Sequence, residues 1–304
     1  MKELDIVIPV YNSSFSIGPL IEKINHWAEK SALNLHVIFV DDGSQDDTYK
    51  ILKEHLNKAN FSYQTIKLAK NYGQHTATAI GFSYTINKLI ATIDDDLQHD
   101  PSDIENMYEY MVQNNCDLVY GNFETKEHHF IRNLGTKILQ KILKLDGRDY
   151  KMVTSYRLMK SSAISVLKNK SNKVYFIDDY LLMGASKVGT CPVYHAKSQS
   201  GTSRYSNWKL MKMAISIVVL HSSLPLKLIS RFGLLMSFVF FITGCSYIYQ
   251  KLVFGLEIGF TSLIVTIFFT TGLILFSLGI IGEYIRRIWV SKQGLDSIII
   301  SEVC

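Results

Sequence analysis

The segment Leu89-Ile90-Ala91-Thr92-Ile93-Asp94-Asp95-Asp96-Leu97-Gln98 places three consecutive carboxylates directly after an apolar run that is typical of a buried strand. Like charges a few Å apart repel one another, so the run is unfavourable unless a cation lies nearby. If the strand continues, its period of two puts Asp94 and Asp96 on one side and Asp95 on the other. Asp94, Asp96 and the amide of Gln98 then offer oxygen ligands for Mg²⁺ or Mn²⁺ shared with substrate phosphates. The alternative is a solvated acidic turn that caps the following helix.

Strand and helix patterns alternate through the first half of the chain. Apolar runs typical of strands occur at 4–8, 36–40, 63–68, 88–93 and 117–120, and residues 17–28 carry apolar side chains at helical spacing. This alternation predicts an α/β fold with a mostly parallel sheet and helices on both faces. Ligands of such sheets bind beyond the carboxyl ends of the strands. The polar segments that follow strands should therefore meet at one site: Pro9–Asn12, Asp41–Ser44 and Asp94–Asp96.

Two uncharged stretches near the end of the chain, 232–250 and 258–282, contain 19 and 25 residues. Each is long enough to cross a hydrocarbon layer of about 30 Å as a helix, and the short link between them predicts a transmembrane hairpin. Basic residues flank the pair on its outer sides: Lys227, Arg231, Arg286, Arg287 and Lys292. By the positive-inside rule, we expect a multi-pass protein of the inner or plasma membrane, with the N-terminal domain and both chain ends in the cytoplasm.

These patterns divide the chain into four parts. We expect a cytoplasmic catalytic domain at 1–205, an amphipathic juxtamembrane segment at 206–230, two membrane helices within 231–290 (about 232–254 and 258–282) and a cytoplasmic tail at 291–304. The net charge is +5, and from Ser206 onward eight Lys or Arg face four Asp or Glu, so the first 205 residues are almost neutral. The absence of a basic patch there argues against nucleic-acid binding. The four cysteines show no metal-ligand spacing and are expected to be reduced.

The polar segments carry the chemistry of a nucleotide-diphosphate site. Asp41 and Asp42, at a strand end, can accept hydrogen bonds from a nucleobase or ribose, and Gly43 lets the backbone approach closely. A divalent ion at Asp94 and Asp96 would neutralise a leaving diphosphate. The Gly-x-x-x-x-Gly-Lys-Ser/Thr loop of many nucleotide hydrolases does not occur in the sequence.

Seven segments, in the same order over nearly the whole chain, resemble family 2 glycosyltransferases of the polyprenyl-phosphate class. They are IVIPVYN (6–12), VDDGSQDDT (40–48), KNYGQHTATAIG (70–81), IDDDLQHDP (93–101), YRLM (156–159), SGTSRYS (200–206) and IIGEYIRRIW (280–289). That class includes dolichyl-phosphate mannose and glucose synthases, and bacterial transferases that load undecaprenyl phosphate with glucose or formamido-arabinose. The resemblance implies a hexosyl- or pentosyltransferase with a GT-A, Rossmann-like sheet, a divalent metal, inversion at the anomeric carbon and a lipid phosphate acceptor. It also suggests a homo-tetramer and a uridine diphosphate sugar, with guanosine or thymidine diphosphate as alternatives.

The resemblance assigns roles position by position. It assigns nucleotide-sugar binding to Pro9, Tyr11, Asp41, Asp42, Gly73, Gln74, Asp94 and Asp95, and metal binding to Asp94, Asp96 and Gln98. It assigns binding of the acceptor phosphate to Arg132, Thr136, Arg204 and Tyr205. Arg132 and Thr136 are four residues apart in a predicted basic amphipathic helix at 130–145, so they share a face, and Arg pairs well with phosphate oxygens. The alternative for Arg132 and Arg204 is charge placed at the membrane interface.

The need for a general base is a separate question. A phosphate monoester is already anionic at neutral pH, because its second pKa is about 6. Relatives often carry an acidic residue just before the Tyr-Arg-Leu-Met segment, where this chain has Ser155. Asp178 and Asp179 are the alternative acids. Asp94, Asp96 and Asp179 form our catalytic set, although Asp179 also suits contact with the sugar or helix capping.

Three other functions stay open at this point. A processive polysaccharide synthase usually carries a Gln-x-x-Arg-Trp motif, and no Trp in this sequence follows an Arg. A glycosyltransferase with a soluble or lipopolysaccharide acceptor would use the hairpin only as an anchor. A non-catalytic membrane scaffold would gain nothing from a cluster of carboxylates at residues 94–96.

Overall fold

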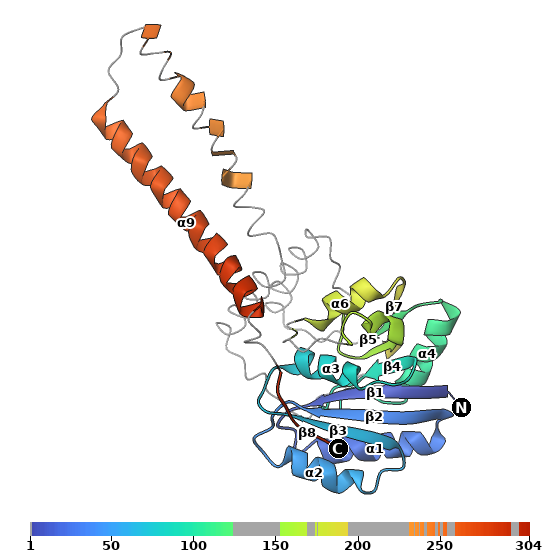
Figure 1. Ribbon diagram of the computed structural model, residues 1–304. Coiled ribbons are helices and arrows are strands. Elements are labelled where there is room, and N and C mark those ends of the chain that lie inside the picture. Colours follow the sequence, from blue (N-terminus) through green and yellow to red (C-terminus); the bar gives the residue numbers. More distant parts are fainter. Residues whose placement is uncertain are drawn as a thin grey trace. The chain divides into compact units, whose positions relative to one another are not determined.

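The computed structural model describes residues 2–123, 153–168, 174, 176–193, 259–292 and 298–304, together with parts of 231–253 (Figure 1). The predicted helix at 130–145 and the juxtamembrane segment at 206–230 lie outside these residues. The chain divides into two compact units. The first contains Met1–Asn133, Tyr150–Arg204 and Asp296–Cys304, and the second contains Leu134–Asp149 and Tyr205–Leu295.

Among the described residues of the first unit, eight strands form one sheet in the order β7-β5-β6-β4-β1-β2-β3-β8. The strands are β1 (Lys2–Val10), β2 (Leu33–Asp41), β3 (Ser62–Leu68), β4 (Leu89–Thr92), β5 (Leu118–Phe123), β6 (Arg157–Lys160), β7 (Val188–Val193) and β8 (Ile300–Val303). β1 pairs in parallel with β2 and β4, as do β2 with β3 and β5 with β7, whereas β6 and β8 run antiparallel to their neighbours. The predicted α/β class is confirmed, in a mixed sheet.

Helices cover both faces of this sheet, as predicted (Figure 1). One core contains side chains of α1 (Ile17–Lys30), α2 (Thr48–Leu56) and α4 (Asp103–Gln113), and the other those of α3 (Gln74–Ser83), the 3₁₀ helix η1 (Ser161–Ile164) and α6 (Ile177–Gly184). Strand alternation explains the division, because Ile6 and Ile8 of β1 face the first core and Val7 faces the second. The sheet is therefore buried on both sides, and its strand ends are left to form a site.

Helix α1 begins and ends close to the predicted segment. Five apolar residues that recur at helical spacing are buried in the first core: Ile17, Leu20, Ile21, Ile24 and Trp27. The sixth, Ala28, is partly buried against it. The N–H of Ser31 donates to the carbonyl of Trp27 and closes the last turn before the chain enters β2.

The strand that precedes the carboxylates is shorter than the sequence suggests. β4 ends at Thr92, so Asp94 lies beyond the strand. Asp95 and Asp96 lie in a turn, and Leu97, which follows, has a φ of 64°. The prediction that alternation along a strand separates Asp94 and Asp96 from Asp95 is therefore wrong. The chain leaves the sheet before the carboxylates, and a positive φ at a non-glycine residue is characteristic of a turn.

The second unit contains α9 (Phe260–Lys292). Within the described part of the chain, no helix meets both the length and the apolarity that a membrane crossing requires. The final described residues differ from the expected tail, because Ile300–Val303 pair with β3 as the edge strand β8.

Candidate functional site

The polar segments that follow β1, β2 and β4 lie against one another at the carboxyl end of the sheet. The N–H of Asn12 donates to Ser44 Oγ at 3.0 Å, and the N–H of Gln45 donates to Asn12 Oδ1 at 2.9 Å. The N–H of Tyr11 donates to Asp95 Oδ2 at 3.1 Å. The sheet thus brings together the three segments that the sequence singled out, as the parallel order of β4, β1 and β2 requires.

Asp41 is the last residue of β2 and is fully buried. Its Oδ1 accepts a hydrogen bond from the N–H of Ser44 at 3.0 Å. Its Oδ2 is buried and has no hydrogen-bond partner among the described residues. A buried carboxylate oxygen without a donor is costly, so this atom is suited to a donor group from a ligand. Pro9 is buried nearby in β1, opposite Val40 of β2.

Asp42 holds the loop that leads into α3. Its two carboxylate oxygens accept the N–H groups of Tyr72 at 2.7 Å and Gly73 at 2.8 Å. Gly43 has a φ of 69°, and a Cβ added there would lie 2.5 Å from the carbonyl carbon of Lys70. The close backbone approach expected at Gly43 is thus made to the chain's own loop. Asp42 and Gly43 shape the site from the side of α3.

Asp94 accepts two side-chain hydrogen bonds, one at each carboxylate oxygen. Gln74 Nε2 donates to Oδ1, and Ser155 Oγ donates to Oδ2. Burial raises the pKa of Asp94, although the Ser155 bond, the charge of Arg157 and the Gln74 bond all oppose the rise. The N–H of Asp94 donates to His99 Nδ1 at 3.2 Å. Asp94 is consequently held in one orientation at the end of β4.

The other two carboxylates of the run have different surroundings. Asp95 also accepts the hydroxyl of Ser13, and burial together with the neighbouring charges of Asp94 and Asp96 raises its pKa to about 6. Asp96 is exposed, and its Oδ1 accepts the N–H of Gln98 at 3.1 Å. In the described residues, no three His, Cys, Asp or Glu side chains are grouped to hold a metal by themselves. An ion here would need further ligands from substrate or water.

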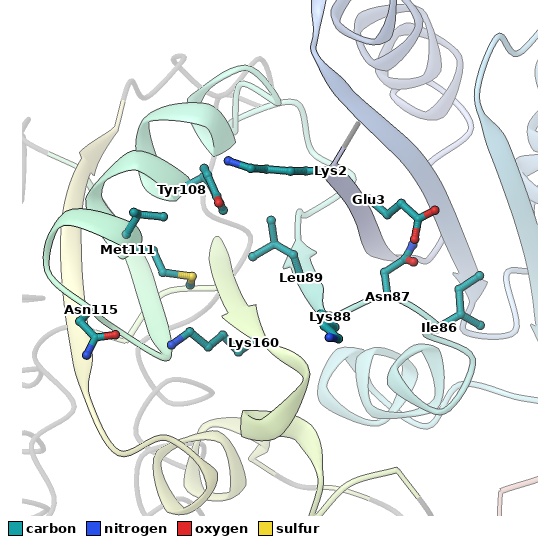
Figure 2. Close-up of a pocket in the computed structure, with 11 residues that line it drawn as sticks. Lys2, Glu3, Ile86, Asn87, Lys88, Leu89, Tyr108, Met111, Asn115 and Lys160 are labelled. Atoms are coloured by element: carbon teal, nitrogen blue, oxygen red, sulfur yellow. The ribbon is translucent and has the colours of Figure 1, made fainter.

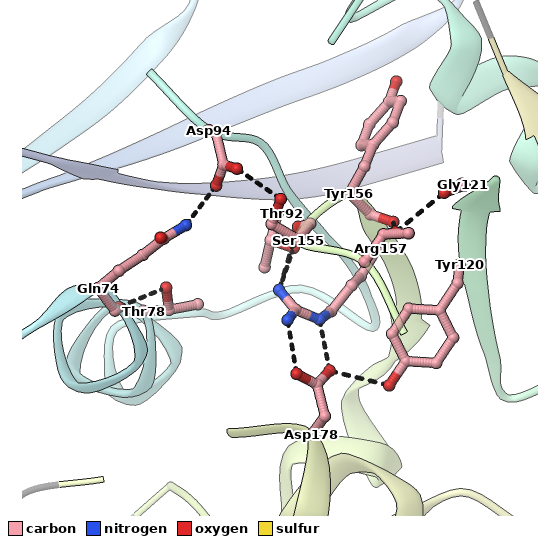
Figure 3. Close-up of polar contacts among 11 residues, drawn as sticks. Gln74, Thr78, Thr92, Asp94, Tyr120, Gly121, Ser155, Tyr156, Arg157 and Asp178 are labelled. Atoms are coloured by element: carbon pink, nitrogen blue, oxygen red, sulfur yellow. Dashed lines mark hydrogen bonds and ion pairs between the residues drawn. The ribbon is translucent and has the colours of Figure 1, made fainter. Parts of the chain in front are cut away.

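A buried ion pair holds Ser155, the residue that donates to Asp94 (Figure 3). Arg157 Nε and Nη2 donate to the two oxygens of Asp178 at 2.7 and 2.8 Å, and the hydroxyl of Tyr120 donates to Asp178 Oδ1 at 2.9 Å. Arg157 Nη1 donates to the carbonyl of Ser155 at 3.0 Å. The guanidinium therefore joins the first turn of α6 to the residue that binds Asp94. Because Asp178 is buried in this pair, it is unsuited to act as a base.

Several of these contacts were not predicted. The sequence marked Ser155 only as a departure from relatives and Arg157 only as part of a motif, whereas both support Asp94 (Figure 3). Ser13 comes directly after Pro9–Asn12, the polar segment at a predicted strand end. That position is the feature of the sequence that could have indicated its contact with Asp95. Asp179 lies in the first turn of α6 and is partly exposed. The predicted acceptor residues lie outside the described residues: Arg132, Thr136, Arg204 and Tyr205.

A pocket of about 740 Å³ lies at the amino-terminal ends of the parallel strands, where β1 and β4 begin (Figure 2). Lys2, Leu89, Tyr108 and Lys160 are among the residues that line it. Its lining, all from the described part of the chain, includes none of the site residues named above. Its position at the amino ends of the parallel strands separates it from the chemistry at their carboxyl ends.

The chain belongs to glycosyl transferase family 2, whose model matches residues 5–164 and so includes Asp41 and Asp94. It is a glycosyltransferase. The undecaprenyl-phosphate 4-deoxy-4-formamido-L-arabinose transferase of Pectobacterium atrosepticum is 30% identical over 302 residues, which cover 97% of this chain and 91% of that protein. The enzyme of the same name from Klebsiella pneumoniae is 28% identical over 297 residues, which cover 95% and 90%.

A solved structure with a similar fold is the glucosyl-3-phosphoglycerate synthase from Mycobacterium tuberculosis in complex with Mn²⁺, uridine diphosphate and phosphoglyceric acid. It is 14% identical to this chain, with a TM-score of 0.49, and the match covers 72% of this chain and 76% of that one.

Proposed function

We propose that this chain moves a sugar from a nucleoside diphosphate to polyprenyl phosphate at a membrane surface. The product is a lipid-phosphate-linked sugar for cell-envelope glycan or lipid modification. The observation that carries the proposal is the meeting of the segments at Asp41 and Asp94 in a family 2 glycosyltransferase. Relatives named for undecaprenyl phosphate, which match 95% and 97% of this chain, support the choice of acceptor.

The donor is proposed to bind at the ends of β1 and β2. Asp41 Oδ2 lacks a donor, and the ring N–H of a uracil base is a group of the kind that it needs. Tyr11 is 41% exposed at the end of β1 and offers an aromatic surface beside the base or sugar. A uridine diphosphate sugar is accordingly the proposed donor, and the names of the relatives make 4-deoxy-4-formamido-L-arabinose the first sugar to test.

A divalent ion is proposed at Asp94, Asp96 and Gln98. The residues fit such an ion, because three adjacent carboxylates, one with its pKa raised to about 6, form a concentration of negative charge that a cation would relieve. Too few protein ligands are grouped here to enclose the ion, which suits a metal that shares its remaining positions with a diphosphate. When bound, Mg²⁺ or Mn²⁺ would neutralise charge on the departing nucleoside diphosphate.

In the proposed reaction, an oxygen of the acceptor phosphate attacks the anomeric carbon of the sugar. The new carbon–oxygen bond forms as the bond to the diphosphate breaks, and the electron pair of that bond leaves with the nucleoside diphosphate. The acceptor is already anionic at neutral pH, so no base has to remove a proton. The neutral Ser155, which donates to Asp94, is compatible with this chemistry. Asp179 is proposed to contact the sugar.

The acceptor is proposed to enter from the membrane. Arg132 and Thr136, with Arg204 and Tyr205, are the proposed phosphate ligands, and 232–254 with 258–282 are the proposed membrane hairpin. The exposed apolar side chains of α9 support this assignment, because apolar surface of that extent suits lipid: Leu263, Ile267, Phe269, Ile274, Leu275, Phe276, Leu278, Ile281 and Ile285. The proposal includes cytoplasmic chain ends at the inner or plasma membrane, and a homo-oligomer.

The test uses the purified full chain with Mg²⁺ or Mn²⁺ and measures transfer of radiolabelled sugar from a uridine diphosphate sugar to undecaprenyl phosphate. We expect label in the organic phase, lost with EDTA and restored by added metal. Equal transfer in EDTA would contradict the proposed role of a divalent metal ion. Label in a long water-soluble polymer would support a processive synthase, and label only on a soluble or lipopolysaccharide acceptor would overturn the lipid acceptor.

A further inference from the structure

The strand β8 extends the sheet on the far side of β3. Ile66 and Lys67 of β3 stand opposite Val303 and Glu302 in antiparallel register. Thr65 and Cys304 exchange two backbone hydrogen bonds at 2.8 and 2.9 Å. This strand lies beyond residues 5–164, which match the family model, and it follows α9 along the chain.

The pairing continues past the end of β3 into the loop at 69–73. The N–H of Ala69 donates to the carbonyl of Ile299 at 2.9 Å, and the N–H of Ile299 donates to the hydroxyl oxygen of Tyr72 at 3.0 Å. Tyr72 is 6% exposed, and the ammonium group of Lys70 lies 5.3 Å from the centre of its ring. Ile299 thus binds both the start of the loop and the far end of the Tyr72 side chain.

The opposite side of the same loop contacts the candidate donor site. The backbone N–H of Tyr72 and that of Gly73 donate to the two oxygens of Asp42. The backbone of Lys70 lies so close to Gly43 that no side chain would fit there. Tyr72 therefore joins β8, through its hydroxyl, to Asp42, through its backbone.

We propose that residues 298–304 position the donor-binding loop, and that the affinity for the nucleoside diphosphate depends on them. This inference rests on the proposed donor site at the ends of β1 and β2, which includes Asp41. When Ile299 holds the Tyr72 hydroxyl, the N–H groups of residues 72 and 73 stay directed at Asp42, and the turn at Asp41–Ser44 keeps the shape that the donor meets. Tyr72 and Ile299 are positioning residues, because they act through Asp42.

The test uses the full chain with Tyr72→Phe, which removes the hydroxyl and keeps the ring. We expect the Kd for uridine diphosphate, measured by calorimetry without acceptor, to rise about fivefold. That factor corresponds to the loss of one typical hydrogen bond. KM for the donor should rise by a similar factor, while KM for undecaprenyl phosphate stays unchanged. Deletion of 298–304 should weaken donor binding further. Tyr63→Phe is the matched control, because Tyr63 is an exposed tyrosine of β3. It should leave the Kd for uridine diphosphate and the KM for the donor unchanged.

Asp41→Asn separates this inference from the donor site on which it rests. If Asp41→Asn weakens binding of uridine diphosphate while Tyr72→Phe leaves it unchanged, the positioning role is overturned and the donor site stands. If neither variant changes the affinity, both proposals fail. A fall in kcat with equal changes in both KM values would show a general loss of structure and would also overturn the positioning role. If the deletion variant does not fold, the comparison of Tyr72→Phe with Tyr63→Phe decides.

Discussion

Asp94, Asp95 and Asp96 are neighbours in the sequence, yet the fold gives each a different environment. Asp94 accepts hydrogen bonds from α3 and from the residue before Tyr156, Asp95 from the end of β1, and Asp96 is exposed. Hydrogen-bond donors from separate elements thus relieve the repulsion between Asp94 and Asp95. Asp96 is left as the carboxylate most accessible to a metal.

We expect Asp96→Asn to reduce transfer by at least about 100-fold, since loss of a direct ligand should exceed the 10–100-fold effect typical of supporting residues. The unfolding temperature should not change, because Asp96 is exposed. Transfer measured across a Mn²⁺ titration, together with thermal unfolding, checks both parts. Glu109→Gln, the same chemical change at an exposed position of α4, is the control and should retain full activity. Undiminished transfer by Asp96→Asn would contradict the metal assignment.

Removing one partner of the buried pair of Arg157 and Asp178 should be strongly destabilising. Asp178→Ala leaves a buried guanidinium without its carboxylate, and we expect the free energy of unfolding to fall by about 3–5 kcal/mol. Tyr120→Phe removes one hydrogen bond from the same carboxylate and should cost only about 1 kcal/mol. Denaturant unfolding followed by circular dichroism measures both changes. Equal effects of the two variants would show that the ion pair is not the main contribution.

At the scale of elements, the turn after β2 and the loop before α3 depend on one glycine. Gly43→Ala places a Cβ 2.5 Å from the carbonyl carbon of Lys70 at a residue whose φ is 69°. We expect a loss of about 1–3 kcal/mol in unfolding free energy and a raised KM for the donor. Gly272→Ala in α9 is the control, since an added Cβ there meets no described atom within 4 Å. An unchanged donor KM in Gly43→Ala would argue against a role of this turn in donor binding.

Asp117 joins three strands of the sheet just before β5. Its carboxylate accepts Lys160 Nζ at 2.8 Å and the N–H groups of Ser186 and Lys187 at 3.1 and 3.2 Å. The hydrogen bond from Lys160 and those from the two backbone N–H groups lower the pKa of Asp117, against a smaller effect of burial.

Because its folded pKa is depressed, the stabilisation from Asp117 is complete above the ordinary carboxyl pKa and is lost as the pH falls through the lowered value. We expect Asp117→Asn to reduce the free energy of unfolding by roughly 1 kcal/mol at pH 7. The difference from the unmodified chain should shrink toward acid pH, as measured by urea unfolding between about pH 2 and pH 7. A difference that stays constant over this range would contradict the assignment to the charged carboxylate.

At the scale of the whole molecule, the first unit is discontinuous in sequence. Its sheet takes β1–β7 from residues before 205 and β8 from residues after α9. The tail that we expected at 291–304 is thus partly a strand, and a chain cut at 205 would leave β3 as an unpaired edge. Any shortened form made for study should retain 298–304.

We expect the full chain to stay with the membrane pellet after alkaline carbonate extraction, because two uncharged stretches of 19 and 25 residues suit a spanning hairpin. Immunoblots of the pellet and the supernatant measure the distribution. A peripheral membrane protein in the same extract is the control and should be released. Release of this chain would contradict the hairpin and would leave surface attachment as the alternative.

Short-range patterns were sufficient to predict the α/β class, the segments that became β1 to β5 and α1, and the membership of family 2. These features depend on periodicity, strand-end chemistry and motif order, which are local in the chain. They also placed Asp41 and Asp94 at one edge of the sheet, because parallel strands bring their carboxyl ends together.

The remaining features were decided by tertiary structure. Three of them join residues distant in sequence: the donation from Ser155 to Asp94, the pair of Arg157 and Asp178, and the return of β8 to β3. The end of β4 at Thr92 likewise depends on its pairing with β1 and β6. β6 and β8 have four residues each, like β4, but β4 is an uncharged apolar run. β6 has a charged residue at each end and β8 contains Glu302, so no apolar run marks either as a strand. Local pattern thus predicts which segments are strands and which ends carry chemistry. Which carboxylate is held, paired or exposed depends on donors that only the folded sheet brings near.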